Sequence, residues 1–233
     1  SYTVGNGPAS VAAADFNKDG IADLAVANGF SNTASIMIAD GKGDFAQPVT
    51  YKTGSEPRSV STGDFNSDGI VDLAVANRRS ANVTILLGEG AGGFKPTDDL
   101  GVGDNPVSVI ARDFNEDGKG DLATVHPRSG FVSLWIGDGR GRFSPPRQFP
   151  VGSEPLFITA GDLNNDRHFD LLIANRFSGT ISILLGDGKG SFAPATTIKA
   201  GDSPVSIAVA DTNRDRFLDV AIANRESENV SIL

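Results

Sequence analysis

An Asp-x-Asn-x-Asp string occurs five times in the chain, each time followed four residues later by another aspartate. The strings begin at Asp15, Asp64, Asp113, Asp162 and Asp211. Oxygen side chains at positions 1, 3 and 5 of a loop, with a backbone carbonyl at position 7, are the ligand spacing of the calcium-binding EF-hand loop. Here the aspartate at position 9 would supply the further carboxylate. Oxygen donors without His or Cys favour calcium over zinc or copper.

The five loops therefore predict up to five calcium ions, one in each loop. The predicted ligands, in loop order, are Asp15, Asn17, Asp19, Ile21 and Asp23; Asp64, Asn66, Asp68, Ile70 and Asp72; Asp113, Asn115, Asp117, Lys119 and Asp121; Asp162, Asn164, Asp166, His168 and Asp170; and Asp211, Asn213, Asp215, Phe217 and Asp219. A hairpin in which Asn and Asp cap their own backbone is the alternative for any single loop. That alternative does not require four oxygen side chains at fixed places five times over.

Position 6 separates the loops into two groups. It is glycine in the first three loops, but Arg167 and Arg216 occupy it in the last two. A positive φ angle is expected there, and it costs a non-glycine residue roughly 1–2 kcal/mol. The loops at 162–170 and 211–219 are therefore predicted to bind calcium more weakly.

The acidity of the chain is concentrated in these loops. The net charge is −9, and the aspartates of the loops make up 15 of the 29 acidic residues. Five calcium ions would bring the net charge to about +1, whereas without metal the crowded carboxylates would repel one another. The acidic balance argues against nucleic acid as a partner. No apolar run approaches the roughly 18 residues that membrane insertion requires.

The strings also define the organisation of the chain, because they recur every 49 residues without interruption. In the second copy, short runs rich in Val, Ile, Leu and Thr at 59–63, 72–76, 82–87 and 94–102 read as four strands bounded by turn residues. Four strands in each repeat of this length are typical of a propeller blade. We therefore predict an all-β, five-bladed β-propeller of four-stranded antiparallel blades in a single domain. The blades span approximately 6–53, 54–102, 103–151, 152–200, and 201–233 together with 1–5.

The two ends of the sequence align with complementary parts of the repeat. Ser1 aligns with Thr50, and Leu233 aligns with Met37. This predicts an N-terminal strand at 2–5 that pairs with 229–233, completes the last blade and closes a monomeric ring of five. A fragment of a larger ring, or an array completed by exchange between chains, is the alternative.

The turns opposite the Asp loops carry arginine. In a four-stranded blade, the turns between the second and third strands share a face with the connections to the next blade. Arg78, Arg176 and Arg225 are the candidate ligand-binding residues of that face, and they could bind a sugar, an anionic glycan or a loop of an extracellular protein. The other charged or amide residues placed there are Glu56, Arg58, Arg79, Asn105, Arg128, Glu154 and Asp202. The alternative is a solvated rim of surface ion pairs, which contribute little to stability.

Catalytic chemistry has little support in the sequence. The only histidines are His126 and His168, and neither has a Ser or Cys partner at a recognisable spacing. We therefore assign no catalytic residue and expect no enzyme activity.

The Asp loops, together with Gly-x-Gly-x-Phe turns such as the one at 41–45, resemble the FG-GAP/VCBS repeats of integrin α-chain propellers and many bacterial surface proteins. The resemblance covers the whole chain; Arg167, Arg216 and the lack of Gly-Ala-Pro at its usual place are departures. It implies calcium between the first two strands of a blade, a role in adhesion or carbohydrate binding, and an extracellular, cell-surface or periplasmic location. A scaffold without its own ligand, or an accessory or catalytic propeller of a carbohydrate-active enzyme, is the alternative.

Overall fold

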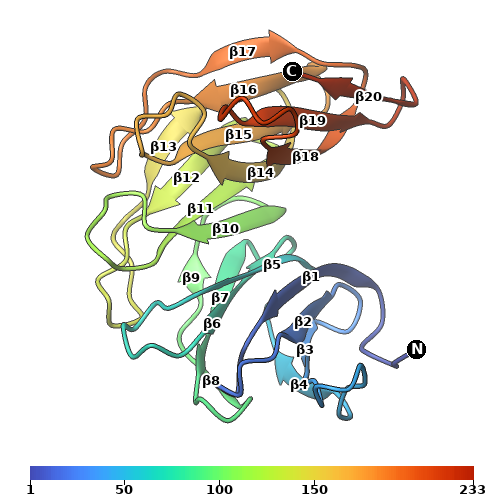
Figure 1. The fold of residues 1–233 in the computed structure, drawn as a ribbon. Helices are drawn as coiled ribbons and strands as arrows, with labels where there is room; N and C mark the ends of the chain where they lie inside the picture. Colours follow the sequence, from blue (N-terminus) through green and yellow to red (C-terminus); the bar gives the residue numbers. More distant parts are fainter.

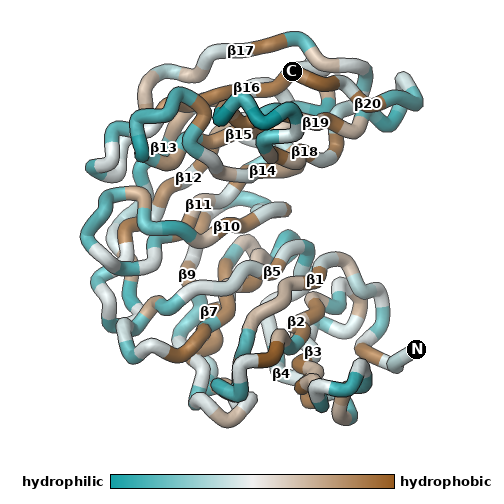
Figure 2. Tube along the Cα trace, in the orientation of Figure 1, coloured by the Kyte–Doolittle hydropathy of each residue, from teal (hydrophilic) through white to brown (hydrophobic).

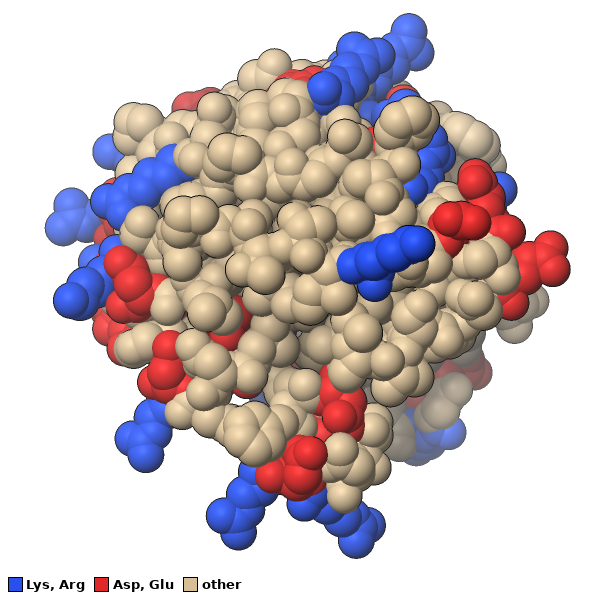
Figure 3. Space-filling view, turned by 90° about the horizontal axis from the view of Figure 1, so that it is seen from above, with Lys and Arg blue, Asp and Glu red and all other residues tan.

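Five small antiparallel sheets make up the computed structural model, which describes all 233 residues. Figure 1 shows the sheets side by side along an arc, with the first strand of each sheet nearest its inner side. No helix long and apolar enough to cross a membrane is present. Seen from above, charged side chains of both signs lie mainly around the periphery, and uncharged atoms cover the centre of the view (Figure 3).

Each sheet follows the order of the chain, and the strands are bounded as follows. The first sheet contains β1 (Pro8–Ala14), β2 (Asp23–Asn28), β3 (Thr33–Met37) and β4 (Val49–Lys52). The second contains β5 (Pro57–Gly63), β6 (Asp72–Asn77), β7 (Asn82–Gly88), β8 (Phe94–Pro96) and β9 (Leu100–Gly101). The third contains β10 (Ser108–Arg112), β11 (Asp121–His126), β12 (Phe131–Trp135) and β13 (Arg147–Pro150). The fourth contains β14 (Pro155–Gly161), β15 (Asp170–Asn175), β16 (Thr180–Leu184) and β17 (Thr196–Lys199), and the fifth contains β18 (Pro204–Ala210), β19 (Asp219–Asn224) and β20 (Asn229–Ile232).

The core lies between successive sheets rather than inside any one of them. Each cluster of buried apolar side chains draws on two neighbouring sheets; Leu73 and Val75 of β6, for example, pack with Ala25 and Ile36 of the first sheet. Because a sheet has neighbours on both sides, every residue of β6, β11 and β15 is buried. This explains why those strands are apolar without alternation. Figure 2 shows the apolar colour recurring along the strands.

The strands predicted for the second repeat are confirmed, except for the last one. The predicted strand at 94–102 is split into β8 and β9, which pair separately with β7. Between them the side chain of Asp99 accepts hydrogen bonds of 2.7 Å from Asn82 Nδ2 and Thr84 Oγ1. These bonds join the segment between the two strands to β7 through side chains instead of a continuous backbone ladder.

The predicted closure of the ring is not formed. The fifth sheet has three strands, β20 pairs only with β19, and residues 1–7 form no strand. Tyr2 instead lies against the first sheet, where its hydroxyl accepts a hydrogen bond from the Phe45 amide at 3.1 Å. Tyr51 makes the same contact with the Phe94 amide of the second sheet at 3.1 Å. The N-terminal segment thus keeps the contacts of a fourth strand with the following sheet, but not the pairing with a preceding one.

The open arc leaves a sheet face exposed at each end. Val11 of β1 is 61% exposed, whereas the equivalent Val60 of β5 is 6% exposed. At the other end, Val230 of β20 is 62% exposed. The two outer sheets therefore each lack one of the neighbours that bury the inner sheets.

In each of the first four sheets, a buried aspartate joins the loop between the first two strands to the end of the third strand through hydrogen bonds. Asp23 is fully buried; its Oδ2 accepts the Phe16 amide at 2.9 Å and its Oδ1 accepts the Ala39 amide at 2.8 Å. Asp72, Asp121 and Asp170 are buried in the same way, each with two backbone amides as donors. Burial raises the pKa of Asp72 and that of Asp121 to about 6, and the amide hydrogen bonds offset only part of that effect.

We expect Asp23→Ala to lower the free energy of unfolding by about 2–4 kcal/mol, because two buried amides lose their acceptor. Urea denaturation in the presence of EDTA measures this effect without any contribution from metal. Asp98→Ala is the matched control, since Asp98 is exposed and its side chain accepts no hydrogen bond. Equal midpoints for the two variants would contradict the structural role of Asp23.

His126 replaces the asparagine that ends the second strand in the other four sheets. In the first sheet the equivalent Asn28 donates a hydrogen bond of 2.9 Å from Nδ2 to Ser35 Oγ. His126 Nε2 lies 2.9 Å from Thr124 Oγ1, while its Nδ1 and the Ser133 hydroxyl have no partner. Burial lowers the pKa of His126 to about 4, although the carboxylate of Asp104 acts in the opposite direction.

His126→Asn should therefore remove a pH dependence from the stability. The unfolded histidine titrates near pH 6.5 and the folded one near 4, so the wild type loses stability as the pH falls through this window. The loss amounts to about 3 kcal/mol. The difference in unfolding free energy between variant and wild type should increase by this amount from pH 7 to pH 4, as measured by urea denaturation. A difference independent of pH would show that His126 is not held neutral.

Candidate functional site

The Asp loops connect the first and second strands of every sheet, and all five fold in the same way. In the first loop, the Asp19 amide donates to Asp15 Oδ1 at 3.1 Å and to Asn17 Oδ1 at 3.0 Å. The Gly20 amide donates to Asp15 Oδ2 at 2.7 Å, and the Ile21 amide donates to Asp19 Oδ1 at 2.8 Å. The same four bonds recur in the other loops, with distances between 2.7 and 3.3 Å.

The donor chemistry of these loops suits calcium at positions 1, 3 and 5. Oxygens of Asp15 and Asn17 share one amide donor, so the two side chains converge, and Asn17 Nδ2 lies 2.9 Å from Asp19 Oδ2. Position 9 differs in burial, because Asp23 is fully buried whereas Asp15 is partly exposed and Asp19 is exposed. No group of three or more His, Cys, Asp or Glu side chains has an arrangement that could hold a metal ion. Calcium binding at the 25 predicted ligands therefore remains a prediction.

The backbone of position 6 has the predicted positive φ angle in every loop. Gly20, Gly69 and Gly118 have φ angles of 84°, 74° and 81°, and Arg167 and Arg216 have angles of 74° and 75°. Position 4 also has a positive φ in all five loops, which the sequence analysis missed. The residues there are Lys18, Ser67, Glu116, Asn165 and Arg214, with φ between 58° and 67°. No glycine marks position 4, so composition gave no signal for it.

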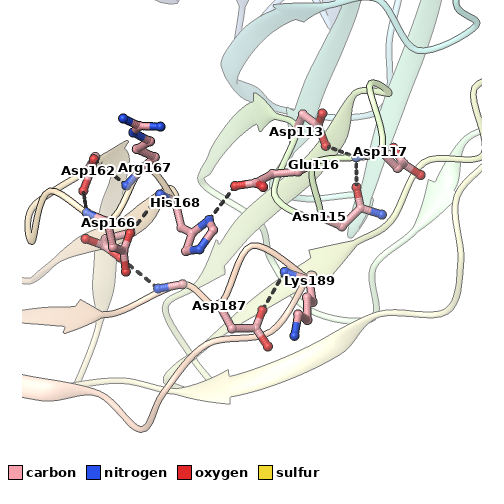
Figure 4. A network of polar contacts seen from close by, with 12 residues as sticks. Asp113, Asn115, Glu116, Asp117, Asp162, Asp166, Arg167, His168, Asp187 and Lys189 are labelled. Atoms are coloured by element: carbon pink, nitrogen blue, oxygen red, sulfur yellow. Dashed lines mark hydrogen bonds and ion pairs between the residues drawn. The ribbon is translucent and has the colours of Figure 1, made fainter.

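The third and fourth loops contact each other through the side chains of position 4 in one loop and position 7 in the other. Glu116 of the third loop lies 2.5 Å from His168 Nδ1 of the fourth loop (Figure 4). This hydrogen bond with Glu116 raises the pKa of His168. His168 therefore links the third and fourth sheets.

The face opposite these loops contains a cavity of about 990 Å³, which is lined by the starts of the innermost strands. All five sheets contribute to it, through the start of each innermost strand and through the turns between the second and third strands of four of them. The lining residues are Gly7, Pro8, Ala9, Gly29, Phe30, Arg58, Arg78, Asn105, Val107, Pro127, Arg128, Ser153, Glu154, Leu156, Arg176, Phe177 and Val205. We refer to it as the arginine-lined cavity. It includes the predicted ligand residues Arg78 and Arg176, but not Arg225.

Three of the four arginines in this cavity are paired with glutamates. Glu56 accepts hydrogen bonds from Arg58, and Arg78 Nη1 lies 3.1 Å from the same carboxylate oxygen. Both oxygens of Glu154 accept hydrogen bonds from Arg176, at 3.0 and 2.5 Å. The hydrogen bond from Arg58 lowers the pKa of Glu56. The fourth arginine, Arg128, forms no ion pair.

Two phenylalanines in the cavity lining were missed by the sequence analysis. Phe30 is 78% exposed and Phe177 is 82% exposed, which makes them the most exposed large apolar residues of the chain. Each lies two residues after the asparagine that ends the second strand of its sheet. Arg78 and Arg176 lie in the equivalent turns, one residue after that asparagine. A comparison of this turn across the five repeats could have found them, because phenylalanine appears there in only two copies.

Solved structures with the same overall arrangement come from proteins of diverse description. A functionally unknown protein from Desulfotomaculum acetoxidans is 15% identical, with a TM-score of 0.70, and the match covers 99% of this chain and 70% of that chain. An auxiliary nutrient binding protein from Bacteroides ovatus is 13% identical, with a TM-score of 0.66 and coverages of 100% and 60%. An Agrocybe aegerita lectin that recognises non-reducing terminal N-acetylglucosamine is 19% identical, with a TM-score of 0.54 and coverages of 79% and 50%. At these identities the likeness concerns the propeller-like fold alone.

The sequence itself matches a family model. No curated protein sequence matches the chain. The model of the FG-GAP-like repeat, however, matches four overlapping segments, at residues 15–75, 64–124, 113–173 and 162–222. Each segment begins at an Asp loop and ends within the second strand of the next sheet. These matches cover most of the sequence, and the chain therefore belongs to the FG-GAP-like repeat family.

Proposed function

We propose that this chain is an extracellular, cell-surface or periplasmic binding module whose ligand is a glycan or a protein. The observation that carries the proposal is the arginine-lined cavity, with Phe30 and Phe177 exposed at its rim. Aromatic residues, including phenylalanine, and arginine are enriched at binding interfaces relative to the rest of a protein surface. Phe30 and Phe177 are the most exposed large apolar side chains of the chain, and both line this cavity.

Calcium in the Asp loops is the second part of the proposal. Five loops with the same oxygen side chains at positions 1, 3 and 5 support it, as does the density of negative charge around Asp72 and Asp121. A divalent cation would offset the repulsion between the carboxylates and stabilise the connection between the first two strands. Arg167 and Arg216 adopt a positive φ angle at a cost that glycine avoids, so their loops would bind calcium more weakly.

Two other roles compete with this one. A scaffold without its own ligand would use the cavity rim only for surface ion pairs such as Arg176–Glu154. A carbohydrate-active enzyme would need an acid or base at the cavity, where Glu154 is the one carboxylate of the lining and both of its oxygens are held by Arg176. His126 is buried, and His168 lies on the loop face. We therefore favour binding over catalysis, by a chain that acts as a monomer.

Calcium should raise the melting temperature of the protein by at least about 5 °C at saturation, because a ligand that binds only the folded state stabilises it. Thermal unfolding in calcium, in EDTA and in magnesium at equal ionic strength measures this shift. Magnesium controls for general screening of the acidic loops. Coincident melting curves in calcium and EDTA would rule out a stabilising role for the metal.

Ligand binding should depend on the cavity arginines. We expect the protein, immobilised with calcium present, to retain at least one ligand from a glycan array or a panel of extracellular matrix proteins. Arg176→Ala should weaken that binding at least tenfold, since it removes a guanidinium held by Glu154 at the cavity. Arg79→Ala, an exposed arginine outside the cavity, is the control and should bind as the wild type does. Binding to no member of either panel would favour the scaffold role.

A further inference from the structure

The turn after the second strand contains a serine at the same place in all five sheets, three residues after the strand ends. A hydrogen bond of this serine holds the turn to the segment that precedes the first strand of the same sheet; we call this arrangement the frame of the turn. Ser31, Ser80, Ser178 and Ser227 each accept a backbone amide, from Asn6, Ser55, Ser153 and Asp202, at distances between 2.6 and 3.3 Å. In the third sheet, Ser129 Oγ donates instead to Asp104 Oδ2 at 2.5 Å. The serine thus anchors the turn in every sheet.

The two residues that each frame presents vary from sheet to sheet. They are Gly29 and Phe30, Arg78 and Arg79, Pro127 and Arg128, Arg176 and Phe177, and Arg225 and Glu226. Since the frame is the same, their side chains are not dictated by the packing of the sheet. Phe30, Arg128 and Phe177 share one turn position and all line the cavity, whereas Arg79 and Glu226 occupy that position outside it. The cavity thus has two phenylalanines and one arginine at the same position of equivalent turns.

The charge of the cavity favours an anionic ligand. Its lining contains four arginines and one glutamate, Glu154. Glu56 and Glu154 already engage Arg58, Arg78 and Arg176. Arg128 forms no ion pair, although its charge acts on the nearby carboxylate of Asp104. A guanidinium without an ion-pair partner presents its donors to a carboxylate or sulfate in the paired geometry that these groups prefer.

The remaining surface favours a sugar over a peptide. Seven of the 17 lining residues are polar or charged, so the cavity offers hydrogen bonds for hydroxyl groups beside its apolar residues. The exposed ring faces of Phe30 and Phe177 can pack against the C–H faces of sugar rings. The volume of about 990 Å³ is large enough for an oligosaccharide of a few rings.

We propose that the arginine-lined cavity binds an acidic oligosaccharide, with a carboxylate or sulfate of the sugar on Arg128 and sugar rings against Phe30 and Phe177. This inference rests on the proposed function, because it specifies the ligand class of the same face. The paired glutamates and arginines serve as hydrogen-bond acceptors and donors for the sugar hydroxyls.

The test is calorimetric titration with matched acidic and neutral oligosaccharides. Tetrasaccharides of hyaluronan, oligogalacturonate and a sulfated glycosaminoglycan are the acidic probes, and chitotetraose and cellotetraose are the neutral ones. At least one acidic probe should bind ten times more tightly than both neutral probes, and its affinity should fall as salt is raised. Arg128→Gln should abolish the preference for the acidic probe, while Phe30→Ala and Phe177→Ala should each weaken binding at least fivefold.

The control variant is Arg79→Gln, which removes one positive charge at the same turn position outside the cavity and should leave the titration unchanged. All four positions are exposed or at the surface of the cavity, and melting curves verify that the variants fold. Equal affinity for acidic and neutral sugars, or an Arg128→Gln variant that keeps the preference, would overturn the inference. So would tighter binding of a poly-aspartate peptide.

The outcome also separates this inference from the broader proposal. If Arg176→Ala abolishes binding of a neutral glycan or a matrix protein while no acidic sugar is preferred, the cavity is a binding site with a different ligand class. If neither these oligosaccharides nor any member of the glycan and matrix-protein panels binds, both proposals are wrong.

Discussion

The arrangement depends on the burial of one carboxylate in each of the first four sheets. Asp23, Asp72, Asp121 and Asp170 each accept two backbone amides, one from the loop between the first two strands and one from the end of the third strand. A carboxylate without water is costly unless such donors surround it. The aspartate therefore fixes the loop face of each sheet, and with it the geometry in which the other loop oxygens converge.

The period of the sequence predicted the sheets and the face that holds the cavity, because both follow from the 49-residue spacing. The split between β8 and β9 could not be predicted, since it depends on hydrogen bonds from Asn82 and Thr84 to the side chain of Asp99. The same limit applies to Asp23 and its equivalents, whose spacing suits a calcium ligand, whereas their second amide donor lies 16 residues farther along the chain. The prediction of ring closure was wrong for a related reason. Alignment of the repeats shows which segments could pair, but not whether the fold brings them together.

The candidate site shows the complementary limit of a repeat-based argument. Arg78 and Arg176 were identified because they recur in equivalent turns, whereas Phe30 and Phe177 were missed because they depart from the pattern. In a structure built from similar repeats, the residues that all repeats share account for stability. Recognition of an asymmetric ligand must come from positions at which the repeats differ. The serine-anchored turns permit this, because their frame tolerates side chains as different as those of Phe30, Arg79 and Glu226.

The exposed faces of Val11 and Val230 have a consequence for the motions of the molecule. Each sheet contacts only its neighbours in the arc, so local stability resembles a chain of nearest-neighbour couplings. The inner three sheets are held on two sides and the outer two on one. Transient opening therefore costs least at the outer sheets, and amide hydrogens there exchange with solvent sooner than those of β6, β11 and β15. All five sheets line the cavity, so local opening of the outer sheets removes the cavity residues of the first and fifth sheets first.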